Sequence, residues 1–185
     1  MAWWRGWFGR QVSPEDLKRD QWRKAWAEAA ADPRQASIAT LTTHLDSLSL
    51  PEEEIELERE MLDGLSAAAT LADSLAHGVL PVIETGHRAV AGAACHFTAP
   101  VSMPDEPSQP SGRLLMTSSR AIFIGGHGAT IPWHVVSTVE NAQRDVVLVR
   151  VDRETLVRFR FNTYADAMAA AMLARRLMPR SASKL

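Results

Sequence analysis

Cysteine is nearly absent from this sequence: its 185 residues include one, Cys95. An intrachain disulfide and a C-x-x-C metal or redox motif are therefore excluded, and a reducing compartment is indicated. No stretch reaches the roughly 18 to 20 consecutive apolar residues that cross a bilayer. Arg5 and Arg10 interrupt the apolar start of the chain, which lacks the core of a signal peptide. We therefore expect a cytoplasmic protein.

Lysine is also rare, with 3 residues against 17 arginines. Together with the abundance of alanine, this ratio is typical of a GC-rich, bacterial coding sequence. The final residues, Ser183-Lys184-Leu185, match a peroxisomal address. In a eukaryote this match is a strong signal and in a bacterium it is a coincidence, so the sequence leaves its role open.

Motifs of the common enzyme classes are missing. The chain contains no G-x-S-x-G nucleophile elbow, no P-loop and no H-E-x-x-H zinc motif. The glycine cluster at residues 125–128 precedes a strand-like segment, which indicates a hairpin turn rather than a phosphate loop. Basic residues are scattered and few aromatic residues could stack on bases. We predict no enzymatic activity, no cofactor and no nucleic-acid partner, and the pattern leaves the oligomeric state open.

Charge and apolar periodicity divide the chain into two regions. Residues 1–80 carry 8 basic and 14 acidic side chains, net −6, whereas residues 81–185 carry 12 basic and 8 acidic, net +4. In the first region apolar residues recur every three or four positions, which predicts helices. The expected helices cover residues 14–31, 35–50 and 51–77. The first helix is expected to start at the N-cap Ser13, the second at the segment Asp32-Pro33-Arg34-Gln35 and the third at the glutamates 52–54. Gly78 is the expected C-cap of the third helix.

After Gly78 the apolar period shortens to two, which predicts strands. The expected strands are residues 88–97, 113–117, 121–124, 130–131, 135–140, 146–151 and 156–161, with an exposed loop over 100–111. A helix from Asn162 and Thr163 to about Met178 closes the chain. The predicted organisation is a Trp-rich segment 1–12, a helical region 13–78, a strand-rich domain 79–179 and a tail 180–185.

Two segments of the strand-rich domain resemble bacterial pleckstrin-homology-like (PH-like) and GRAM domains. Residues 112–124 follow the family pattern G-x-L-x-x-T-x-x-R-x-x-F, and residues 131–139 are similar to its I-P-x-x-x-I-x-x-V strand. The resemblance covers about residues 80–178. It implies an α+β protein in which a seven-stranded β-barrel or sandwich is capped by the C-terminal helix. It also implies binding of phosphoinositides or proteins, although the loop 100–111 lacks the dense lysine cluster of a lipid site.

Arg150, Arg158 and Arg160 are our candidate anion-binding or lipid-binding residues. In the last two expected strands the odd-numbered residues of 147–151 and 157–161 are apolar, so these arginines project from the other face. If a loop of three residues joins the two strands, their apolar residues lie on the same face of the sheet and Arg150 lies opposite Arg158. Like charges in opposition cost stability. A bound phosphate is one interpretation, and a solvated face neutralised by Asp152 or Glu154 is the other.

The Trp-rich segment is a candidate anchor to a membrane or to a partner. Its aromatic residues are Trp3, Trp4, Trp7 and Phe8, interleaved with Arg5 and Arg10. Indole and guanidinium groups together suit the membrane interface. The alternative is that these rings pack on the helical region or on a partner chain.

Cys95 and the nearby histidines leave open an alternative function as a metal-dependent or thiol enzyme. On a strand Cys95 and His96 point to opposite faces, so they would share an ion only at a bulge. Cys95 and His87 have the same parity and could converge. A buried thiol beside satisfied histidines is the more common arrangement, so we predict no metal site.

The acidic run 52–60 could dock on the basic strand-rich domain, bind a basic partner or lie solvated. The sequence as a whole indicates a non-enzymatic binding or adaptor module. Its expected partner is another protein or an anionic membrane surface at the inner face of the cell membrane. We also expect residues 79–185 to fold without the helical region.

Overall fold

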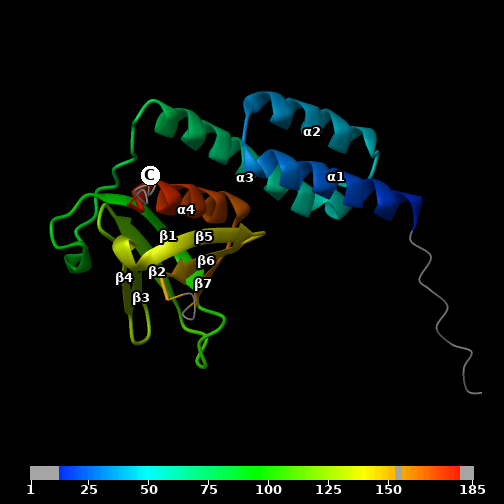
Figure 1. Cartoon of the computed structure of the whole chain (residues 1–185). Helices are drawn as coiled ribbons and strands as arrows, with labels where there is room; N and C mark the ends of the chain where they lie inside the picture. The colour runs from blue at the N-terminus through cyan, green and yellow to red at the C-terminus, as the bar shows by residue number, and fades with distance from the viewer. Residues whose placement is uncertain (1–12, 153–155, 180–185) are drawn as a thin grey trace, which may run out of the picture.

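The computed structural model of the chain describes residues 13–152 and 156–179. Its elements are α1 (Pro14–Ala31), α2 (Gln35–Ser47), α3 (Glu52–Ala76), the 3₁₀ turn η1 (Arg88–Val90), β1 (Cys95–Ser102), β2 (Ser111–Thr117), β3 (Arg120–Ile124), β4 (Ala129–Pro132), the 3₁₀ turn η2 (Trp133–Val135), β5 (Val136–Ala142), β6 (Asp145–Arg150), β7 (Leu156–Phe161) and α4 (Tyr164–Leu177). Figure 1 shows helices α1 to α3 grouped together, the strands on the other side and α4 between the two groups. The predicted α+β class is confirmed.

Local sequence signals account for most of the helix ends. Ser13 Oγ accepts the Asp16 N–H at 3.0 Å, and the Asp16 carboxylate accepts the Ser13 N–H, which completes a capping box. Gly78 follows α3 with φ +77°, a conformation that glycine adopts without steric cost. Helix α2 begins at Gln35, as predicted, but the predicted capping signal is wrong: the N-cap is Arg34, which makes no side-chain capping bond. Asp32 instead serves as the C-cap residue of α1.

The seven strands form one antiparallel sheet in the order β4-β3-β2-β1-β7-β6-β5. Strand β1 pairs with β2 along its whole length but with β7 only at Val101 and Ser102. The sheet therefore consists of two halves joined at a short seam. Among the described strands, the edge strands β4 and β5 share no ladder. The fold is accordingly a sandwich rather than a closed barrel, and α4 covers one end of it (Figure 1).

The start of the sheet differs from the prediction. Residues 88–90 form η1, and β1 runs from Cys95 through Pro100 to Ser102. The loop between β1 and β2 is therefore residues 103–110, shorter than expected. Pro100 fits into the strand because the ladder with β7 begins only at the next residue, which leaves an open edge where an N–H is not needed.

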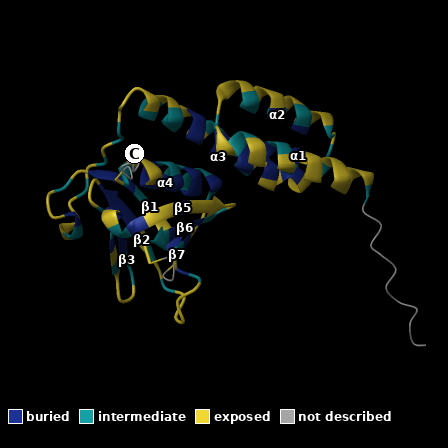
Figure 2. Ribbon diagram, viewed as in Figure 1, coloured by how far each residue is buried: buried dark blue, intermediate teal, exposed yellow. Residues whose placement is uncertain are grey.

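Buried side chains form two large clusters that meet at α4. One cluster lies between the sheet halves and the inner face of α4 and contains Trp133 and Phe159. The other lies among α1, α2 and α3 and contains Trp22, together with Tyr164 and Met168 from α4. Figure 2 shows this burial on the facing sides of α3 and α4 and on the inner side of the strands. Helix α4 thus completes both cores, and it fixes the helical region against the sheet.

Candidate functional site

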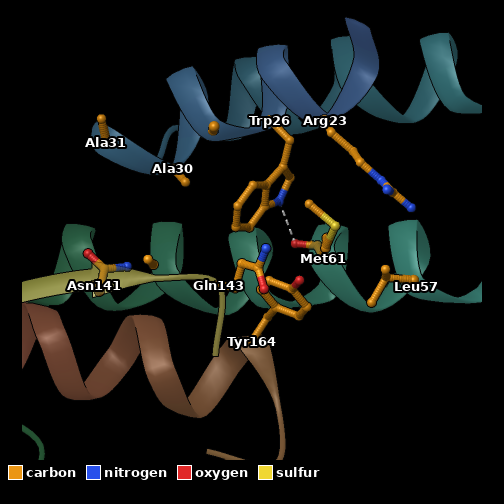
Figure 3. Close-up of a pocket in the computed structure, with 11 residues that line it drawn as sticks. Arg23, Trp26, Ala30, Ala31, Leu57, Met61, Asn141, Gln143 and Tyr164 are labelled. Carbon is orange, nitrogen blue, oxygen red and sulfur yellow. Dashed lines mark hydrogen bonds between the residues drawn. The ribbon is translucent and has the colours of Figure 1, made fainter. Parts of the chain in front are cut away.

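A shaped concavity lies where the helical region meets the sheet. Its volume is about 490 Å³, and its wall comes from α1, α3, the β5–β6 hairpin and the start of α4. The lining residues are Arg23, Trp26, Ala27, Ala30, Ala31, Leu57, Met61, Asn141, Ala142, Gln143 and Tyr164. We call it the junction groove. Figure 3 shows these side chains converging from the helices above and below and from the hairpin between them.

Trp26 forms the floor of the junction groove. Its indole Nε1 donates a hydrogen bond of 2.7 Å to the Met61 carbonyl on α3, which is drawn as the dashed line in Figure 3. The edge of its ring meets Tyr164, with ring centroids 5.4 Å apart and planes at 82°. This edge-to-face arrangement is favourable for aromatic pairs. The two rings therefore present a rigid apolar surface at the bottom of the groove.

Tyr164 is held in place by charges from two other elements. Its backbone N–H, at the start of α4, donates to Glu60 Oε1 at 3.2 Å. Glu60 also forms an ion pair with Arg144 from the β5–β6 turn, and the Arg144 guanidinium lies 5.3 Å from the centre of the Tyr164 ring. Burial raises the pKa of the Tyr164 hydroxyl, so it stays protonated well above neutral pH. Tyr164 is therefore fixed in place before a ligand binds, and its protonated hydroxyl is not a general base.

A second ion pair closes the α1–α3 side of the junction groove. Glu58 is fully buried, and its Oε1 accepts a hydrogen bond of 2.8 Å from Arg23 Nε. Arg23 is partly exposed at the rim. The aliphatic stem of an arginine covers apolar surface while its charged end reaches water. The pair thus binds α1 to α3 and leaves little net charge at this edge.

The opposite rim is polar and includes a strained residue. Gln143 begins the two-residue turn between β5 and β6 and has φ +56°, a conformation that side chains other than glycine rarely adopt. Asn141 is exposed, and its Oδ1 accepts a hydrogen bond of 2.9 Å from Arg175. Backbone strain of this kind is found disproportionately at binding sites. The groove can therefore receive an apolar side chain and offer amide hydrogen bonds to the backbone beside it.

The candidate arginines do not assemble as the sequence predicts. In the observed register Arg158 lies opposite Val147 and Arg160 lies opposite Asp145, so the expected pairing of Arg150 with Arg158 is wrong. The cause is the run Val146–Val149, which is apolar at every position. The even-numbered members point into the core, and the strand therefore carries Arg150 on the opposite face from Arg158 and Arg160.

Arg158 and Arg160 are neutralised by an acidic residue of the neighbouring strand. Both guanidinium groups donate to the Asp145 carboxylate, at 2.6 Å from Arg158 Nη2 and 2.9 Å from Arg160 Nε. Arg158 also reaches Asp105 in the β1–β2 loop at 3.4 Å. The hydrogen bonds from Arg160 and Arg158 hold the pKa of Asp145 below its usual range despite partial burial. Neutralisation by carboxylates, one of our two interpretations, is thus observed, but through Asp145 and Asp105.

Cys95 and the histidines do not converge on a metal site. Cys95 is buried, and its thiol donates to the Phe97 carbonyl at 3.2 Å. A bulge does occur at His96, but the ring of this buried residue makes a 2.8 Å hydrogen bond with the Pro81 carbonyl. His87 Nδ1 accepts the Ala89 N–H and so caps η1. Within residues 13–152 and 156–179, no three His, Cys, Asp or Glu side chains are grouped for an ion.

The acidic run on α3 docks in two directions. Glu54 pairs with Arg19 at 3.1 Å, and Glu58 pairs with Arg23, so part of the run binds α1. Among the ion pairs that this run forms with described residues, only that of Glu60 reaches the strand-rich domain, through Arg144. Docking on the basic domain, one of the three alternatives for this run, is therefore observed for one glutamate.

The anchor candidates Trp3, Trp4, Trp7 and Phe8 lie outside the described residues. In the described part of the chain, no helix combines the length and the apolar character needed to cross a bilayer.

Sequence reasoning missed the junction groove. Trp22 and Trp26 are one helical turn apart, and this spacing marks a buried face on α1. Tyr164, directly after the expected cap Thr163, could have been assigned to the same core. The tryptophan spacing does not show that Gln143 lies on the opposite side of the junction groove, because more than 110 residues separate Gln143 from α1. Comparison with models of known protein families and with curated proteins gives no match for this chain.

Proposed function

We propose that the protein is a non-enzymatic binding module that acts in the cytoplasm and holds a short segment of a partner protein in the junction groove. The observation that carries the proposal is the groove itself. Its aromatic and aliphatic floor and amide rim come from four separate elements, and its volume of about 490 Å³ is within the range of ligand pockets, roughly 300 to 1,000 Å³. Such a site takes one large apolar anchor together with its flanking backbone.

Pre-organisation supports this assignment. Two ion pairs and the Trp26 hydrogen bond hold the wall in place before any ligand binds, so less conformational entropy is lost on binding. The strained backbone at Gln143 is retained on the rim, where a glycine would remove the strain. A role for the Gln143 side chain in ligand binding would explain why this backbone strain is retained.

A protein partner is favoured over an anionic membrane surface. The lipid hypothesis relies on Arg158 and Arg160, and both already bind Asp145. An anion would have to compete with that carboxylate. Arg150 lies on the other face of the sheet and cannot add to the same patch. Peripheral membrane binding is therefore the alternative that vesicle sedimentation tests.

The alternative of a thiol or metal enzyme receives less support. The Cys95 thiol is buried and donates to a backbone carbonyl, whereas a reactive cysteine is partly exposed and lies near a base or a cation. His96 is similarly occupied by Pro81.

We further propose that residues 79–179 form a PH-like domain. The strand order and the C-terminal helix that closes one end support this assignment, as do the two sequence segments that resemble the family. In this proposal the N-terminal helices extend a PH-like scaffold and build one wall of its binding groove.

The test is selection of a phage-displayed peptide library on the full-length protein. We expect enriched peptides to share an aromatic or large aliphatic residue and to lose binding at least tenfold on Leu57→Gln, which places an amide in the groove wall. Leu17→Gln is the matched control, because Leu17 is 52% exposed on α1 and does not line the groove. Equal binding to both variants would overturn the assignment of the groove. Sedimentation with phosphatidylserine vesicles, but no peptide enrichment, would favour the membrane surface instead.

A further inference from the structure

An acidic flank borders the junction groove on α3. Glu53 and Glu56 are exposed, and neither forms an ion pair with any residue that the structure describes. Glu53 precedes Leu57 by one helical turn, so the two side chains are neighbours on the helix surface. Leu57 lines the groove and is 39% exposed, so its side chain is available to a ligand. A ligand that suits this surface would combine apolar rings with positive charge.

The chain carries such a segment directly before α1. Residues 1–12 include three tryptophans, one phenylalanine and two arginines, and contain no acidic residue. Indole rings are large, rigid and able to donate one hydrogen bond, which matches an apolar floor with an amide rim. The arginines match the carboxylates of Glu53 and Glu56. The composition of the segment is therefore complementary to the groove and its acidic flank.

The distances allow the segment to reach the groove from its own attachment point. Ser13 caps the start of α1, and the groove begins at Arg23, nine residues beyond Pro14. At 1.5 Å per helical residue this separation is about 14 Å along the axis. Twelve residues extend to at most about 40 Å. The tryptophans can thus return along α1 and enter the groove of the same molecule.

We propose that residues 1–12 bind the junction groove of their own chain and compete with the partner segment for it. This inference rests on the proposed function, since it assigns a first ligand to the same site. A partner must then displace the segment, so the apparent affinity for the partner falls by the fraction of molecules whose groove is free. The groove would bind tightly only those partners that outcompete a tethered ligand.

The indole N–H groups provide a direct test by NMR on the full-length chain. Replacing Trp3, Trp4 and Trp7 together by Ala should shift the Trp26 indole resonance, because its ring loses a neighbour. Trp22 and Trp133 are internal controls, because their indoles donate inside other parts of the core, to Leu41 and Thr117. An unchanged Trp26 resonance would overturn the proposal.

The reciprocal substitution completes the test. Leu57→Gln in the otherwise unchanged chain should shift the indole resonances of the N-terminal tryptophans, and Leu17→Gln should leave them in place. Shifts that vary with protein concentration would overturn binding within one chain. Resonances that respond to phosphatidylserine vesicles but not to Leu57→Gln would also overturn it, in favour of a membrane anchor.

The library peptides separate this proposal from the proposed function. The triple alanine chain should bind them about tenfold more tightly than the wild type, if the segment occupies nine-tenths of the grooves. Equal affinity for both chains would contradict self-occupation and leave the peptide-binding function standing. Absence of binding to either chain would contradict the proposed function itself.

Discussion

The Asp145 carboxylate on β6 lies against the Arg160 guanidinium on β7 and accepts two hydrogen bonds from it, at 2.9 and 3.0 Å. The same carboxylate accepts two more from Arg158. One acidic side chain thus orients two arginines that the sequence presents as a positive patch. The lipid hypothesis is therefore tested by substituting Asp145 rather than Arg158 or Arg160.

Replacing Asp145 by Asn should create binding to anionic vesicles. Removing the carboxylate leaves Arg160 without its ion pair and Arg158 with only the 3.4 Å contact to Asp105. The positive charge of this face is then less neutralised, and attraction to anionic lipids follows. We expect salt-sensitive sedimentation with phosphatidylserine vesicles and none with phosphatidylcholine vesicles. Asp105→Asn is the control, since it removes a single 3.4 Å contact. Equal vesicle binding by wild type and Asp145→Asn would show that the ion pairs do not mask the arginines.

The same residue predicts a component of acid sensitivity. The pKa of Asp145 is lowered in the folded protein, chiefly by the hydrogen bond from Arg160. Its contribution is therefore complete above the pKa of an unfolded aspartate, near 4, and is lost as the pH falls through the folded value. Urea unfolding should show a steeper loss of stability below about pH 4 in wild type than in Asp145→Asn. Parallel curves would mean that the ion pairs contribute no stability.

Gln143 should show opposite effects on stability and binding. Gln143→Gly relieves the positive φ of +56° and should raise the free energy of unfolding by up to about 1 kcal/mol. It also removes an amide from the groove, so the selected peptides should bind several-fold more weakly. Gln143→Ala keeps the strain and removes the same amide, which separates the two effects. A glycine variant with unchanged peptide affinity would exclude a role for this side chain.

Gly64 of α3 packs directly against the start of α4. A Cβ built at this position would lie 2.8 Å from the Tyr164 Cβ and 3.1 Å from the Ala165 backbone nitrogen. Gly64→Ala should therefore destabilise the protein by about 1 to 3 kcal/mol through overpacking, although alanine favours helix. Thr70→Ala, at an exposed position of the same helix, should change stability by less than about 0.5 kcal/mol. Chemical denaturation of both variants measures the difference, and a stabilised Gly64→Ala would show that the helices separate easily.

The strand-rich domain should depend on the helical region. The sequence predicts that residues 79–185 fold alone, but Tyr164 and Met168 of α4 are buried against α1 and α3. Leu71 and Leu75 of α3 also pack on the sheet core. We expect this fragment to bind a dye that reports exposed apolar surface and to melt well below the full chain. A fragment that melts at the same temperature and binds no dye would show that the two regions are energetically independent.

Local signals in the sequence account for the elements but not for every boundary. The capping box at Ser13 places the start of α1, because the first helical N–H groups need acceptors that lie a few residues away. Alternating apolar and charged residues place β7, and short apolar runs place β2 and β3, for a similar local reason. The sequence predicts too early a start for β1, because the short apolar residues before Cys95 suit a strand and a 3₁₀ turn equally.

The sequence by itself determined the α+β class, the order of helices and strands, and the acidic and basic halves, since each depends on neighbours within a few positions. Tertiary structure decided the face of β6, because residues 146–149 are apolar throughout and only contact with β7 and the core selects the inward set. It also decided the junction groove. Trp26, Leu57, Gln143 and Tyr164 are brought together by packing between helices and a hairpin, and no periodicity along the chain encodes that meeting of distant segments.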